Sequence, residues 1–107
     1  MTSQIIDLRS NHPLNGTWRC CGDENDIEIT IDFKASGATV SIIDRYDGEI
    51  LGVYDISWDA ASHVLSCGVH WSTGRFVRYR FSHCSRDDRV DVTYTYTDRE
   101  TWERVQT

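Results

Sequence analysis

Residues 26–34 read DIEITIDFK, a stretch in which an apolar residue alternates with a charged or hydroxyl-bearing one. Successive side chains of an extended chain point to opposite faces, so the apolar residues share one face. They are Ile27, Ile29, Ile31 and Phe33. This period of two predicts a β-strand with one buried side, and Ala35-Ser36-Gly37 predicts the turn that follows it.

The same alternation recurs at hairpin spacing along the rest of the chain. Further strands are predicted over residues 17–21, 39–44, 49–58, 65–71, 77–81, 90–97 and 101–105. Asp47-Gly48 is a typical tight-turn pair, and Gly52 predicts a bulge or bend. After Gly52 the alternation places Tyr54, Ile56 and Trp58 on one face.

The predicted fold is all-β, a small antiparallel up-and-down barrel of about eight strands. The helical period is absent except for one short turn at residues 5–8, expected to act as a lid. An open meander would leave two exposed edges, and closing the sheet on itself removes them. No linker or internal repeat divides the sequence, so residues 1–107 are predicted to form a single domain.

Composition and charge exclude several classes of partner. The chain has 17 acidic and 11 basic residues, a formal net charge of −6. Nucleic acids and anionic membrane surfaces both require clustered Lys and Arg, so neither is expected as a partner. No run approaches the ~20 apolar residues of a membrane span, and the first residues do not resemble a secretory signal. A cytoplasmic location is therefore expected.

The four cysteines are predicted to be reduced thiols without a metal. They are Cys20, Cys21, Cys67 and Cys84. Adjacent Cys20 and Cys21 point to opposite faces of a strand, and so do Cys67 and His70, so neither pair forms a zinc site. No metal ligand set, catalytic residue or cofactor motif is assigned.

Two segments resemble the lipocalin-like, or calycin, pattern. Asn15-Gly16-Thr17-Trp18-Arg19 matches the Gly-x-Trp that opens such barrels, and Thr101-Trp102-Glu103-Arg104-Val105 matches their last strand. The resemblance implies that first and last strands meet and that Arg104 lies across the indole of Trp18. A guanidinium stacked on an indole is a favourable cation–π contact, so this pair is expected to close the base of the barrel.

The leading functional hypothesis is non-catalytic binding of a small hydrophobic or aromatic ligand inside the barrel. Aromatic side chains dominate the predicted interior, and phenolic hydroxyls can orient a ligand there. The residues expected to line the cavity are Tyr54, Trp71, Tyr79, Tyr94 and Tyr96. The competing interpretation is that these rings fill the core, because a barrel of eight strands barely holds its own side chains.

Two other functions stay open. Arg75, Arg78 and Arg80 are expected to form an outward basic stripe beside the loop Ser72-Thr73-Gly74, which favours a protein-interaction or inhibitor module. A barrel enzyme that shapes its substrate, as a cyclase does, comes third, since His12 and His63 read as surface residues and His70 points outward. The oligomeric state is not fixed, because an incompletely closed barrel can pair its edges with a second copy as a homodimer.

Overall fold

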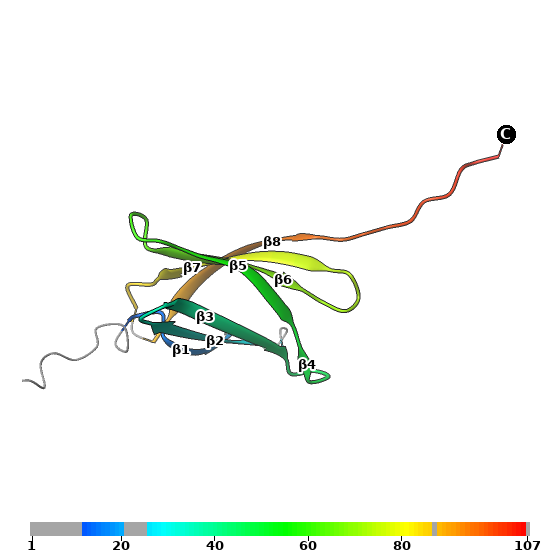
Figure 1. The fold of residues 1–107 in the computed structure, drawn as a ribbon. Helices are drawn as coiled ribbons and strands as arrows, with labels where there is room; N and C mark the ends of the chain where they lie inside the picture. Colours follow the sequence, from blue (N-terminus) through cyan, green and yellow to red (C-terminus); the bar gives the residue numbers. More distant parts are fainter. Residues whose placement is uncertain (1–11, 21–25, 87, 107) are drawn as a thin grey trace, which may run out of the picture.

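The computed structural model describes residues 12–20, 26–86 and 88–106, and these form an all-β fold (Figure 1). The described residues contain eight strands. They are β1 (Gly16–Arg19), β2 (Ile27–Lys34), β3 (Gly37–Asp44), β4 (Glu49–Ile50), β5 (Gly52–Asp59), β6 (Val64–His70), β7 (Phe76–His83) and β8 (Val90–Thr97). The prediction of an all-β chain is confirmed. The predicted turn at residues 5–8 lies outside the described residues.

The strands form two antiparallel sheets of four, and each sheet follows chain order. One sheet is β1-β2-β3-β4 and the other is β5-β6-β7-β8. The strand predicted over residues 49–58 is divided at Leu51, where the chain passes from the first sheet to the second. Hydrogen bonding between the sheets does not close a barrel within the described residues.

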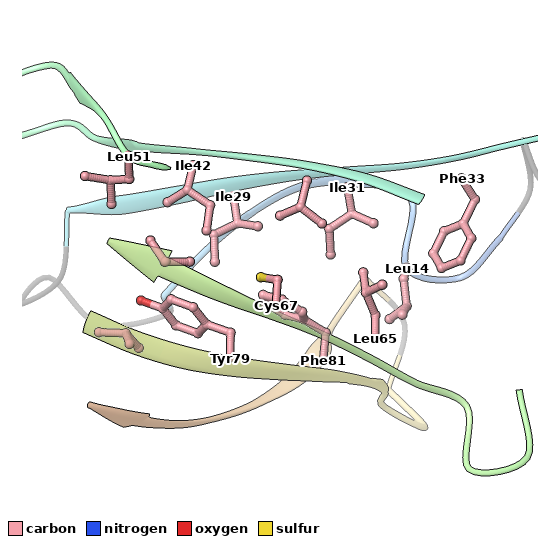
Figure 2. Close-up of a cluster of buried hydrophobic side chains, with 13 residues drawn as sticks. Leu14, Ile29, Ile31, Phe33, Ile42, Leu51, Leu65, Cys67, Tyr79 and Phe81 are labelled. Carbon is pink, nitrogen blue, oxygen red and sulfur yellow. The ribbon is translucent and has the colours of Figure 1, made fainter. Parts of the chain in front are cut away.

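The core lies between the two sheets, where both contribute the apolar half of their alternation (Figure 2). Ile29 and Ile31 come from β2, while Leu65, Cys67 and Phe81 enter from the opposite sheet and are fully buried. Strand β2 is paired along its whole length with β3, so Ile31 lies opposite Val40 on the same buried face. The alternation in residues 26–34 therefore predicted this face correctly.

A β-bulge in β5 reverses the predicted alternation. The β5–β6 register shifts between Tyr54 and Ser57, and Asp55 has a positive φ of 55°. The extra residue changes which face the following side chains occupy. Trp58 therefore packs against the core while Tyr54 lies on the outer face, where its ring contacts that of Phe76. The expectation that Tyr54, Ile56 and Trp58 share a face was wrong, because the bulge follows Tyr54 instead of falling at Gly52.

The predicted last strand is also absent. Residues 98–106 form no strand and are exposed, and in Figure 1 they run away from both sheets. Arg104 lies in this segment and does not cross the indole of Trp18, whose Nε1–H instead donates to the Leu14 carbonyl at 2.9 Å. The expected contact between first and last strands is therefore not formed in this structure.

Candidate functional site

The two sheets are open to each other on the side bounded by β1 and β8. Each of these strands has one neighbour among the described residues, β2 for β1 and β7 for β8. The inward side chains of β8 become more exposed along the strand: Val90 is half-buried, Val92 is 39% exposed, and Tyr94 and Tyr96 are 58% and 59% exposed. The opening therefore widens toward the end of β8.

This opening is a cleft with two connected parts. The inner part has a volume of about 350 Å³ and runs from Trp18 and Ile27 on the first sheet to Val92 and Tyr94 on the second. The outer part has a volume of about 600 Å³ and extends to Trp71 and Tyr96. Cys20, Ile27, Tyr79 and Tyr94 line both parts, which makes them one continuous surface.

Stacked tyrosine and phenylalanine rings form the β7–β8 wall of the cleft. The Tyr79 ring is stacked on that of Phe81 at 5.7 Å between centres, and it lies 5.9 Å from the ring of Tyr94. Burial, with smaller effects of Tyr94 and Cys67, raises the pKa of Tyr79 to about 12. Its phenol is therefore neutral at physiological pH and can donate a hydrogen bond to an uncharged ligand.

The mouth of the cleft is polar. The guanidinium carbon of Arg75 lies 5.3 Å from the centre of the Tyr96 ring, and its Nε lies 3.2 Å from Asp98 Oδ1. Asp26 and Asp44 line the same mouth from the first sheet. An apolar interior with charged groups at its rim is the usual arrangement of a site for a small ligand.

Four of the five residues predicted to line a cavity lie together in this cleft, namely Trp71, Tyr79, Tyr94 and Tyr96. Tyr54 is separated from them by the thickness of its sheet. The rings of Tyr54 and Phe76 pack together over Gly68. A Cβ added at Gly68 would lie only 3.1 Å from atoms of both rings. The reason is the bulge in β5, which the alternation of the sequence did not reveal.

The sequence interpretation missed the part of the cleft that β1 and β2 provide. Trp18 and Ile27 line the inner part, together with Val90 and Val92 of β8. The resemblance assigns Trp18 only a structural contact with Arg104. Val90 and Val92 share the parity of Tyr94 and Tyr96 in residues 90–97, which is the signal in the sequence that could have found them.

The centre of the sandwich is filled by side chains. Leu65, Cys67, Val69 and Phe81 are fully buried there. Burial raises the pKa of the Cys67 thiol to about 11, so it packs as a small apolar group and is not a nucleophile at neutral pH. The interior thus has two regions, a packed centre and an open cleft along one side.

A cluster of rings caps one end of the sandwich. His12 stacks on Phe33 at 3.8 Å between ring centres and lies edge-on to Trp58 at 5.0 Å. Its Nδ1 accepts a hydrogen bond from the Leu14 amide at 3.1 Å. The interpretation of His12 as a surface residue was wrong, since it is half-buried, whereas His63 is exposed and stacks on the outer side of Trp58.

The predicted basic stripe is divided by the strand geometry. Arg78 and Arg80 lie on the outer face of β7 and line a shallow polar hollow with Ser66 and Thr93. Arg75 precedes β7 and turns toward Tyr96 at the cleft mouth. His70 is exposed, as predicted. Within the ranges that the structure describes, no group of His, Cys, Asp and Glu side chains is arranged to hold a metal ion.

No protein-family model, curated protein sequence or solved structure matches this chain. Among the described residues there is no helix of the length and apolar character needed to span a membrane.

Proposed function

We propose that this protein binds a small, largely apolar or aromatic molecule in the cleft between β1 and β8, without chemical conversion. One observation carries the proposal: Tyr94 and Tyr96 remain more than half exposed although both belong to the inward-facing series of β8. Removing large aromatic rings from water lowers the free energy of the system. Binding of an apolar molecule that covers these exposed rings is therefore favourable. Neutral Tyr79 at its floor suits a ligand that carries a hydrogen-bond acceptor.

The volume of the cleft fits this class of ligand. Pockets for small organic molecules commonly enclose about 300–1,000 Å³, and the inner part has about 350 Å³. The inner surface comes mainly from aliphatic and aromatic side chains, including Trp18, Ile27 and Val92. These groups bind by removal of apolar surface and would discriminate poorly among ligands of similar shape.

We further propose that the fold is a lipocalin-like barrel whose closure involves residues 101–105. The up-and-down strand order and the position of Trp18 beside the gap support this proposal. The gap separates the edges of β1 and β8, and one added strand there would complete the wall of the cleft. Free strand edges recruit such a strand readily, because their backbone groups lack ladder partners.

Titration with a neutral fluorescent aromatic probe, such as N-phenyl-1-naphthylamine, tests the binding proposal. We expect saturable enhancement of probe emission and quenching of tryptophan emission, because Trp18 and Trp71 line the cleft. Tyr94→Ala should weaken binding by about tenfold, equivalent to ~1.4 kcal/mol for one lost ring contact. Tyr54→Ala is the matched control on the outer face and should leave the affinity unchanged.

Two results would count against this function. One is a linear, unsaturable response of the probe with the native protein. The other is equal weakening by Tyr94→Ala and Tyr54→Ala, which would place binding outside the cleft or make it a consequence of general stability. Native mass spectrometry of freshly expressed protein adds an independent readout, since a retained small molecule would identify the ligand class directly.

A further inference from the structure

The free edge of β8 and the exposed segment that follows it have matching properties. Trp102 is 85% exposed, and Tyr94 and Tyr96 are each more than half exposed on the inner face of β8. Trp102 and Arg104 continue the even-numbered series of Val92, Tyr94 and Tyr96. An extended chain carries residues of one parity on one face, so a strand over residues 98–105 would present Trp102 to the cleft side.

The segment belongs to no strand, and in Figure 1 it runs outward from the end of β8. Trp102 Nε1 donates to Glu100 Oε1 at 2.7 Å, a contact between side chains two residues apart and therefore on the same side of an extended chain. No described residue of either sheet pairs with this segment through a backbone ladder. Its apolar residues and its backbone groups are therefore both available to another strand.

The start of the segment is held in line with β8. The β7–β8 ladder ends at Phe76 and Thr97, and the next residues outward, Arg75 and Asp98, form a side-chain salt bridge at 3.2 Å. The guanidinium of Arg75 also covers the Tyr96 ring. In Figure 1 the chain accordingly leaves β8 without reversing direction.

A return onto its own β8 edge would require a tight turn at this held position. Residues 98–101 read DRET and contain no Asn-Gly, Asp-Gly or Gly-Gly pair, the pairs that favour two-residue hairpin turns. The turn would also separate Asp98 from Arg75. Pairing with a second copy needs no turn and leaves the Arg75–Asp98 contact intact. A two-fold axis perpendicular to the sheet places the segment of each copy antiparallel to the β8 edge of the other.

The exposed rings of the segment and of β8 supply the contact area. In antiparallel pairing Trp102 and Arg104 lie beside the β8 side chains that line the inner part of the cleft. A dimer brings together two Trp102 rings and four exposed tyrosine rings. A large aromatic side chain can bury up to ~150–250 Å² of accessible surface. With the paired backbone added, such a contact approaches the ~1,200 Å² at the lower end of specific interfaces.

We propose that the protein is a homodimer formed by exchange of residues 98–105, in which each copy supplies the strand that closes the cleft of the other. The ligand site is then incomplete in a single chain. This inference rests on the closure proposed above and adds that the closing strand belongs to the partner. It does not depend on the identity of the ligand.

Light scattering during size-exclusion chromatography, combined with peptide-level hydrogen exchange on the full chain, tests the proposal. We expect a dimer at tens of micromolar in which residues 101–105 are protected from exchange. Glu103→Pro removes a ladder donor in a segment that has no strand in the single chain, so the monomer fold is preserved. It should raise the dimer dissociation constant at least tenfold and abolish the protection. Gln106→Pro, just outside the proposed strand, is the control and should change neither.

These measurements distinguish strand exchange between two copies from closure of the cleft by residues 101–105 of the same chain. A monomer with protected residues 101–105 would overturn exchange and support closure by the same chain. A monomer with unprotected residues would overturn both, and a dimer unaffected by Glu103→Pro would place the interface elsewhere. Arg75→Ala should increase the monomer fraction by releasing Asp98. Arg78→Ala, which removes an exposed arginine from the outer face, should not, and equal effects of the two would refute the role assigned to Arg75.

Discussion

The two long sides of this sandwich are bounded in different ways. On one side the chain passes from β4 to β5 through Leu51, which is buried, so a covalent connection and an apolar residue join the sheets. On the other side β1 and β8 end their sheets, and Tyr94 and Tyr96 remain exposed between them. The same alternating pattern thus produces a packed core where the sheets are joined and an open cleft where they are not.

The joined region should dominate stability. Leu65→Ala removes a fully buried side chain of the packed core and is expected to lower the free energy of unfolding by ~2–5 kcal/mol. Tyr94→Ala removes a ring that is already largely in water and should cost below about 1 kcal/mol. Chemical denaturation of both variants measures the difference, and similar losses would show that the cleft is packed in solution.

Cysteine reactivity gives a second contrast between the core and the cleft. Cys67 is fully buried, and its pKa is raised from the ordinary value to about 11 by burial, whereas Cys20 is exposed at the cleft. The raised pKa alone lowers the thiolate fraction by about a hundredfold at neutral pH. We expect peptide mass spectrometry after brief iodoacetamide treatment to find Cys20 modified and Cys67 intact. Comparable labelling of the two would contradict the buried position of Cys67.

A smaller effect is expected at the end of the sandwich, where His12 connects Phe33 of one sheet with Trp58 of the other. Burial lowers the pKa of His12, and the positive charges of His63 and His83 lower it further. Because the pKa of His12 is lower in the folded protein than in the unfolded chain, protonation favours unfolding. The stability that neutral His12 contributes is therefore fully present above pH ~6.5 and declines as the pH falls below that value.

Protonation of His12 also removes the acceptor of the Leu14 amide, a hydrogen bond worth about 1 kcal/mol. Thermal denaturation between pH 7.5 and 5 should therefore show a weaker pH dependence in His12→Gln than in the native protein. His70→Gln, at an exposed position, is the control. An unchanged pH dependence in His12→Gln would assign the effect to other groups.

The sequence predicted the strands better than it predicted their closure. Alternation identified the buried faces of β2, β6 and β7 because one-sided burial leaves a direct period-two record. It could not locate the bulge at Asp55, since one extra residue in the left-handed region leaves no compositional mark, and Tyr54 was consequently assigned to the wrong face. Residues 101–105 have the pattern of a strand, but the pattern does not specify which edge, or which copy, supplies its partner.

The candidate site was predicted in part for the same reason. Trp71, Tyr79, Tyr94 and Tyr96 share an inward face within one sheet, so local alternation was sufficient to group them. The contributions of Trp18 and Ile27 depend on how the two sheets face each other across the gap. That relation arises from the passage of the chain at Leu51, which no local pattern encodes.

The most direct test is an NMR titration of isotope-labelled protein with the neutral aromatic probe. The cleft predicts that backbone amide signals of Trp18 on β1 and of Val92 and Tyr94 on β8 shift together and saturate at one concentration. Signals of Leu51 and Tyr54 should stay in place. Shifts centred on β4 and β5, or no saturable shifts at all, would contradict a binding cleft on the open side of the sandwich.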